Sequence, residues 1–172
     1  MISNNILFTG LPGCGKTTLV EKIVKKTGKP ACGFVTRELR EKGRRVGFTI
    51  NTLDGKQGLL AHRHIKSRYR VGKYGVDIDV MDRIAVPAMI PERPHALVVI
   101  DEIGKMECFS PLFKKMLTNL LDSAHPVIGS ISLKGDAFIR RIKARGDVVV
   151  VQVTEQNREG LIDIYAGAVP RM

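Results

Sequence analysis

The feature that most constrains the fold is a glycine-rich octapeptide that fits the pattern G-x-x-x-x-G-K-[ST]: Gly10-Leu11-Pro12-Gly13-Cys14-Gly15-Lys16-Thr17. An apolar run at residues 6–9 precedes it, and a stretch of helical character at residues 16–26 follows it. Glycines allow the backbone to turn tightly and to point its N–H groups at phosphate oxygens, and the following helix adds its positive N-terminal end. The sequence therefore predicts a strand, a phosphate-binding loop and a helix, in that order.

Each polar residue of this loop has an expected task. Lys16 would reach the β and γ phosphates of a nucleotide, and the hydroxyl of Thr17 would bind a magnesium ion. Thr18 would contact the α phosphate. A helix N-terminus lowers a thiol pKa, so Cys14 has a possible redox role, but we favour the simpler interpretation of a small residue that fits the loop.

A second constellation lies at residues 97–102, where an apolar strand ends in Asp101 and Glu102. Asp101 is placed to support the magnesium ion from the strand end. Glu102 is placed to accept a proton from an attacking water molecule. Tandem acids at this position are typical of P-loop enzymes that activate water, whereas nucleotide kinases usually lack the glutamate.

The rest of the chain alternates strand-like and helix-like segments. Strands are expected at residues 6–9, 31–36, 97–100, 126–131 and 148–153, and helices at 16–26, 79–89, 110–121, 136–144 and from about 155. Such alternation predicts an α/β fold of three layers, with a mostly parallel sheet that binds its ligand at the carboxyl ends of the strands.

One segment interrupts this pattern. Residues 46–51 and 58–61 flank an Asp54-Gly55 turn and predict an antiparallel hairpin, and residues 62–75 read as a loop. We therefore expect a single domain over residues 1–172, with a basic hairpin insertion at about 37–75.

The charge is concentrated in the same segment. The whole chain carries a formal +11, and residues 37–73 contain eleven Lys/Arg against three Asp/Glu, a local balance of +8. A solvated surface, a lid over the triphosphate and a nucleic-acid site are all compatible with this charge. We favour the lid, because Arg37 and Lys73 bracket the insertion and are expected near the phosphates.

The cysteines and the apolar runs indicate in which cellular compartment the protein is expected. Cys14, Cys32 and Cys108 form no CxxC pair, which argues against a zinc cage or a disulfide framework. No apolar run is long enough to span a bilayer, and no signal-like N-terminus is seen. We expect a cytoplasmic protein with no membrane partner.

Several weaker candidates stand near the expected strand ends. Lys105 would either stabilise transition-state charge or pair with Glu107 or Glu102. Arg37, taken to close the second strand, would contact the γ phosphate or stay on the surface. Ser130 and Ser132 stand at a strand end and would either sense the γ phosphate or form a turn. Arg158 would lie against the base, in a last helix that Thr154 caps.

A resemblance covers the chain from end to end. The loop Gly10–Thr18 is followed in order by Gly33-Phe34-Val35-Thr36-Arg37-Glu38, Arg45-Val46-Gly47-Phe48, Val71-Gly72-Lys73-Tyr74-Gly75-Val76-Asp77, Asp101-Glu102-Ile103-Gly104-Lys105-Met106-Glu107 and Val153-Thr154-Glu155-Gln156-Asn157-Arg158. Together these segments resemble the small archaeal and bacterial nucleoside-triphosphatase family, which is related to the vertebrate cancer-related NTPase. The resemblance implies a RecA-like sheet and slow hydrolysis of ATP, GTP, CTP, UTP and TTP with little base selectivity. It also implies that the nucleotide is held by the loop and by residues 97–104, Gly104 included.

The sequence thus predicts magnesium-dependent hydrolysis of nucleoside triphosphates, with Lys16 and Glu102 as the catalytic residues. Two alternatives remain. A nucleotide or polynucleotide kinase would pass the phosphoryl group to an acceptor held by the basic segment, and the Asp101-Glu102 pair disfavours it. A nucleic-acid-binding ATPase module would use hydrolysis to serve binding, and the acids do not separate it from a simple NTPase.

Overall fold

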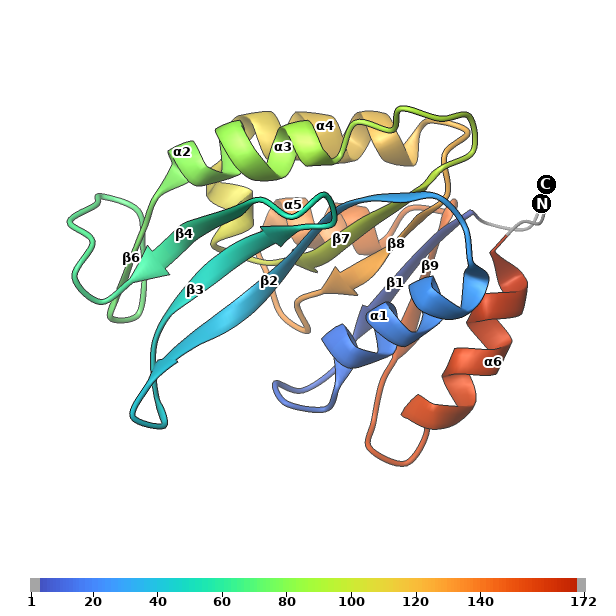
Figure 1. Cartoon of the computed structure of the whole chain (residues 1–172), viewed down its shortest axis with the longest axis horizontal. Helices are drawn as coiled ribbons and strands as arrows, with labels where there is room; N and C mark the ends of the chain where they lie inside the picture. The colour runs from blue at the N-terminus through green and yellow to red at the C-terminus, as the bar shows by residue number, and fades with distance from the viewer. Residues whose placement is uncertain (1–3, 170–172) are drawn as a thin grey trace.

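The computed structural model describes residues 4–169 (Figure 1), so the two ends of the predicted domain, residues 1–3 and 170–172, lie outside the described residues. The described residues form one nine-stranded sheet in the order β5-β6-β4-β3-β2-β7-β8-β1-β9. The strands are β1 (Asn5–Thr9), β2 (Ala31–Glu41), β3 (Arg44–Thr52), β4 (Gln57–His62), β5 (Arg70–Val71), β6 (Tyr74–Val76), β7 (Leu97–Ile103), β8 (Val127–Ile131) and β9 (Val148–Gln152).

The five strands β2, β7, β8, β1 and β9 are parallel and form the predicted core of the sheet. The apolar side chains of the inner strands β1, β7 and β8 are buried, as expected for strands that are covered on both faces, whereas the edge strand β9 leaves Val149 exposed. β8 lies between β1 and β7, so the strand before the phosphate loop and the strand that ends in two acids are two positions apart. At about 4.8 Å between neighbouring strands, the two strands are roughly 10 Å apart. This arrangement is the predicted RecA-like one, and it brings the loop and the acids to the same edge of the sheet.

Helices cover both faces of this parallel core (Figure 1). α1 (Lys16–Thr27) and α6 (Arg158–Ala168) pack on one face, where α1 contributes Leu19 and Ile23 to the core. On the other face lie α4 (Pro111–Leu121), α5 (Ala137–Lys143) and a helical run made of α2 (Ile78–Val80), η1 (Met81–Ala85) and α3 (Val86–Ala88). A short η2 (Glu107–Phe109) precedes α4. Among residues 4–169, none of these helices combines the length and the apolar character that crossing a bilayer requires.

The sheet continues beyond β2 as an antiparallel extension, which we define as β3, β4, β6, β5 and the outer part of β2. The predicted hairpin across Asp54-Gly55 is confirmed, because β3 and β4 are antiparallel and join there. The insertion is nevertheless larger than predicted. β2 runs on to Glu41 and forms a second hairpin with β3, and the expected loop at 62–75 contains β5 and the start of β6. These short strands were missed because two or three residues carry no readable alternation.

Two further boundaries differ from the sequence prediction. The expected helix at 79–89 is a continuous helical run over 78–88 that includes a five-residue π-helical segment, η1. The last helix begins at Arg158 and not at about Glu155. The predicted cap Thr154 instead closes the preceding turn, because its hydroxyl accepts the N–H of Asn157 while the Asn157 side chain accepts the N–H of Thr154. A reciprocal pair of this kind stabilises a turn as well as it would cap a helix.

Candidate functional site

The phosphate loop joins β1 to α1 at the carboxyl edge of the parallel strands. Gly10 must be a glycine, because a Cβ there would lie 2.5 Å from the carbonyl oxygen of Val153. Gly15 occupies the N-cap of α1 with φ 95°, a left-handed conformation that favours glycine. Since Gly15 has no side chain to accept the first N–H groups of the helix, these donors stay available to a bound anion. The backbone of the loop can thus offer several N–H donors to an anion.

Lys16 is the cation of this loop. Its ammonium group donates to the carbonyl oxygens of Gly10 and Leu11, both at 3.0 Å, and lies 3.8 Å from the sulfur of Cys14. These contacts hold the ammonium group against the backbone of the loop. Cys14 is buried against the loop, which agrees with its interpretation as a small fitting residue.

Asp101 lies opposite the loop, near the carboxyl end of β7, with only 1% of its surface exposed. Its pKa is raised to about 6, mainly by burial and less by the charges of Glu102 and Glu21, while hydrogen bonds from the hydroxyls of Ser130 and Thr17 act in the opposite direction. Ser130 donates a hydrogen bond to Oδ1. Thr17 and Asp101, predicted to share a metal ion, are therefore brought together from α1 and β7.

A β-bulge shapes the acidic end of β7. Pairing with β8 is regular up to Ile100 and Gly129 and resumes at Ile103 and Ile131, so Asp101 and Glu102 together face the single residue Ser130. An extra residue of this kind bends a strand and redirects its side chains. Because of the bulge, the two consecutive carboxylates Asp101 and Glu102 can both lie at the carboxyl end of the sheet.

Glu102 belongs to a second polar cluster just beyond Asp101. Its Oε1 accepts a hydrogen bond from the hydroxyl of Ser132 at 3.1 Å. A Cβ on Gly104 would lie 2.8 Å from the same oxygen, 2.9 Å from a carboxylate oxygen of Glu107 and 3.1 Å from the Ser132 hydroxyl, so a larger residue there would displace these side-chain ends. The predicted nucleotide contact Gly104 thus has a close steric role beside Glu102.

Glu107 is a buried acid beside Glu102. Burial and, to a smaller extent, the charge of Glu102 raise its pKa to about 8. The hydroxyl of Thr36 donates to Glu107 at 3.0 Å. Thr36 follows the part of β2 that pairs with β7 and carried no functional expectation, although a polar residue near a strand end was a signal for it.

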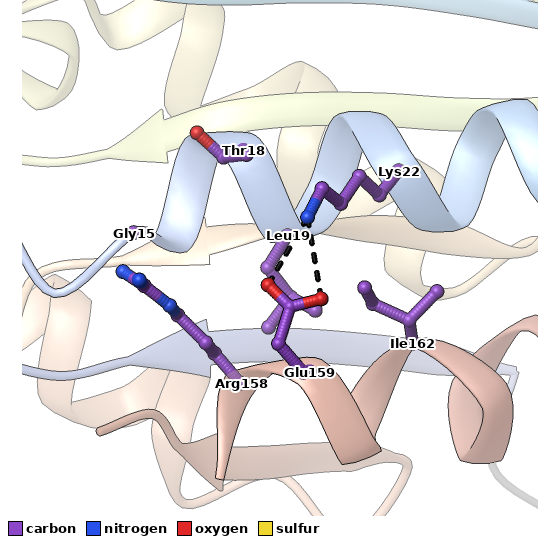
Figure 2. A pocket seen from close by; sticks show the side chains of 7 residues that line it. All are labelled: Gly15, Thr18, Leu19, Lys22, Arg158, Glu159 and Ile162. Carbon is purple, nitrogen blue, oxygen red and sulfur yellow. Dashed lines mark hydrogen bonds and ion pairs between the residues drawn. The ribbon is translucent and has the colours of Figure 1, made fainter. Parts of the chain in front are cut away.

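The remaining sequence candidates fall into different places. Arg37 does not close β2 as predicted, because the strand continues for four residues, and its guanidinium pairs with Glu21 of α1. Lys105 is exposed and, within residues 4–169, forms no ion pair, so of its two alternatives the pairing with Glu107 or Glu102 is not found. Arg158, in contrast, lies against the phosphate loop (Figure 2), with Nη1 3.5 Å from the carbonyl oxygen of Cys14.

Lys73 is not near the phosphate loop. It stands in the turn between β5 and β6, and β6 is six positions from β1 in the sheet, roughly 30 Å at the usual strand spacing. The prediction that Lys73 belongs to a lid over the phosphates is therefore wrong. Sequence order suggested proximity, but the antiparallel extension carries this part of the chain to the far edge of the sheet.

The oxygen atoms of Asp101 and Thr17 suit a magnesium ion that also binds the phosphate oxygens of a nucleotide. Oδ2 of Asp101 is buried and has no hydrogen-bond partner within the described part of the chain, and the Thr17 hydroxyl is close enough to this carboxyl group to lower its pKa. No group of three His, Cys, Asp or Glu residues between positions 4 and 169 would hold a metal by itself. Mg²⁺ is commonly bound by one or two protein oxygens together with water and substrate phosphates, and this donor set fits that pattern.

Comparison with known proteins places this geometry in a family. The model of the family described as NTPase matches residues 5–165. The nucleoside-triphosphatase THEP1 of Thermotoga sp. (strain RQ2) is 44% identical over 161 residues, which cover 92% of this chain and 91% of the relative.

Two solved structures share the fold. The crystal structure of THEP1 from Aquifex aeolicus superposes with a TM-score of 0.88 at 32% identity, covering 97% of this chain and 99% of that one. The solution structure of a human cancer-related nucleoside triphosphatase gives 0.81 at 37% identity, covering 96% of each chain. With a family match over most of its length and relatives of this identity, the chain belongs to the NTPase family that includes THEP1 and the human cancer-related nucleoside triphosphatase.

Proposed function

We propose that this protein hydrolyses nucleoside triphosphates to the diphosphate and phosphate with the help of Mg²⁺. The observation that carries the proposal is the convergence of the loop residues Lys16 and Thr17 with Asp101 and Glu102 at one edge of the sheet. The relatives' names, nucleoside-triphosphatases, support the same reaction class.

The loop and the metal ligands would neutralise the negative charge of the triphosphate. Backbone N–H groups at the start of α1 bind the phosphates, and Lys16 leaves the carbonyls of Gly10 and Leu11 to contact the β and γ groups. Thr17 and Asp101 hold Mg²⁺, which supplies charge neutralisation at the phosphate oxygens. Burial favours a neutral Asp101, so the cation would also keep its carboxylate ionised.

Glu102 would prepare the attacking water. Its carboxylate is oriented by the Ser132 hydroxyl and stands next to the metal ligand Asp101. A protonated Glu107 beside it adds no second negative charge at neutral pH, because its pKa is raised to about 8. Glu102 then accepts a proton from water in line with the γ phosphorus.

The experiment that tests the function is phosphate release from ATP, GTP, CTP, UTP and TTP by the purified protein with Mg²⁺ and with EDTA. The same assay is repeated with candidate acceptor nucleotides and with RNA and DNA. Release that needs Mg²⁺ but no acceptor supports the NTPase. Label transfer to an acceptor at the expense of free phosphate would support the kinase instead.

We predict little discrimination among bases. No segment of the sequence resembles the Asn-Lys-x-Asp guanine reader, so base recognition rests on stacking and apolar contact. The five triphosphates should be hydrolysed with kcat/KM values within about a tenfold spread. A preference of three orders of magnitude for one base, measured under identical metal and salt conditions, would contradict this prediction.

A further prediction concerns the far edge of the antiparallel extension. Replacing Lys66, Arg68 and Arg70 together by Gln should leave the KM and kcat for nucleotides within about twofold of wild type, because β5 is seven positions from β1 in the sheet. A fivefold rise in KM would restore the lid interpretation for this edge.

The matched control removes three exposed lysines from other surfaces, Lys25, Lys115 and Lys134. Both triple variants are also titrated with single-stranded RNA across a range of salt concentrations. Nucleic-acid binding through these residues would lower the slope of log affinity against log salt by about 0.7 per lost contact in the first variant and not in the control. That result would promote the nucleic-acid-binding module.

A further inference from the structure

Glu107 is a buried acid without a cationic partner. Only 4% of its surface is exposed, and within residues 4–169 no Lys or Arg forms an ion pair with it. A buried carboxylate that lacks such a partner is costly, so burial favours the neutral acid. The raised pKa of Glu107, about 8, has burial as its main cause. At neutral pH the side chain is therefore a carboxylic acid with one O–H group to donate.

Thr36 fixes the orientation of this carboxyl group. β2 and β7 are neighbours in the sheet (Figure 1), and Thr36 directly follows Val35, which pairs with Asp101. The Thr36 hydroxyl donates to Oε1 of Glu107 at 3.0 Å. The carbonyl oxygen of an acid is its better acceptor, so this hydrogen bond favours Oε2 as the oxygen that carries the proton.

Oε2 of Glu107 lies on the side of Glu102. A Cβ on Gly104 would be 2.9 Å from this oxygen and 2.8 Å from Oε1 of Glu102. Both oxygens thus lie close to one point, in the space that the missing side chain of Gly104 leaves open. Oε1 of Glu102 already accepts a hydrogen bond from Ser132 at 3.1 Å. The O–H group of Glu107 is placed to act on the same carboxylate as a second donor.

We propose that Glu107 is a positioning residue for hydrolysis, which Thr36 orients and which donates its O–H group towards the carboxylate of Glu102. The proposal rests on the proposed function, since it names what orients the proposed base. A neutral donor holds Glu102 in place without adding a charge beside it. Loss of the proton would remove the donor and place a second negative charge next to Glu102.

The charges around Glu107 determine the direction of the pH effect. Glu102 and Asp101, both on β7, raise its pKa. The thiol of the adjacent Cys108 has a raised pKa, mainly through burial, and stays neutral, while Asp136 and Lys114 act on that thiol with opposite signs. Glu107 is therefore neutral below about pH 8 and ionised above it. We expect kcat to be maintained below this pH and to fall as the pH rises through it.

Variants of Glu107 separate its hydrogen bond from its charge. Glu107→Gln keeps a donor and an acceptor but cannot ionise, so kcat at neutral pH should stay within about threefold of wild type and the alkaline decline should disappear. Glu107→Leu fills the space without a donor, and kcat should fall by about 10- to 100-fold, the usual cost of losing a partner that orients an active-site group. KM for nucleotide should change by less than about threefold in both variants.

Variants of Thr36 test the orientation by a readout that a merely structural role would not move. The Thr36 hydroxyl lowers the pKa of Glu107, because it donates to the carboxylate. Thr36→Val removes this donor at equal shape, so the alkaline decline of kcat should move to higher pH. Thr36→Ser should keep the midpoint of wild type. Glu92→Leu, at an exposed glutamate outside the cluster, is the matched control and should leave the pH profile unchanged.

Three outcomes would overturn the proposal: a Glu107→Gln variant as impaired as Glu107→Leu, an alkaline decline that persists in Glu107→Gln, or equal losses of kcat and nucleotide binding. Melting temperatures show whether each variant folds, and if Glu107→Leu does not, Glu107→Gln and the Thr36 variants still carry the test.

Failure of the proposed function is distinguishable, because wild type would then release no phosphate. The titration of Glu107 can still be followed by NMR of protein labelled with ¹³C at the glutamate Cδ, with the resonance assigned by its loss in Glu107→Gln. A midpoint near 8 that rises in Thr36→Val supports the arrangement of Thr36 and Glu107. A midpoint at the ordinary glutamate value of about 4.3 would overturn it.

Discussion

Lys16→Ala should abolish hydrolysis and strongly weaken triphosphate binding. Lys16 is the only charged side chain in the loop from Gly10 to Thr17, and its ammonium group already lies 3.0 Å from two loop carbonyls. Loss of a preorganised charge that stabilises a transition state commonly costs 100- to 1000-fold in turnover, and here roughly the upper figure is expected. Phosphate release and the dissociation constant for a non-hydrolysable analogue measure the two effects.

Lys25→Ala provides the control for this variant. Lys25 belongs to the same helix and is exposed, so its removal changes the net charge equally without touching the loop. Comparable melting temperatures would show that both variants are folded. Near-normal turnover of Lys16→Ala would refute the assignment of this loop as the phosphate site.

Glu102→Gln should separate chemistry from binding. The amide keeps the size of the side chain and can still accept a hydrogen bond from Ser132, but it cannot take a proton from water. Turnover should fall by roughly 100-fold or more, while the dissociation constant for nucleotide changes by less than about threefold. Single-turnover phosphate release, combined with analogue binding, distinguishes the two quantities.

The matched variant is Glu92→Gln, an exposed glutamate outside the cluster, which should behave as wild type. If Glu102→Gln lost binding and turnover in equal proportion, Glu102 would be a metal-supporting or structural residue and not the base. In that case the water would need another acceptor, and the proposed role of Ser132 in orienting the base would also be wrong.

Much of the fold could be predicted from local pattern. The phosphate loop is contiguous, so its turn, its cation and its helix are fixed by neighbouring residues, and the apolar run before Asp101 marks a buried strand. Alternation of strands and helices gave the parallel core, because a crossover between parallel strands requires a helix. The resemblance to the nucleoside-triphosphatase family added the RecA-like arrangement, and the strand order bears it out.

The antiparallel extension was harder to predict, for a physical reason. The hairpin of β3 and β4 was predictable from its Asp-Gly turn, but the outer strands β5 and β6 are only two and three residues long, too short to show an alternating pattern. Which strand such a short segment pairs with depends on the sheet edge that is available to it, and that edge exists only in the assembled fold. Sequence order therefore placed Lys73 near the phosphates, while the sheet places it at the opposite edge.

By itself, the sequence determined the chemistry that one contiguous segment can carry: a backbone cradle, a lysine, a hydroxyl, and two acids at the end of an apolar strand. Only the tertiary structure decided how these segments meet. The bulge in β7 sets Asp101 and Glu102 against Ser130, burial shifts the pKa of Asp101 and Glu107, and the packing of α6 on α1 brings Arg158 to the loop, 144 positions from its contact at Cys14. Contacts between residues so distant in the chain depend on strand order and helix packing, which no local pattern records.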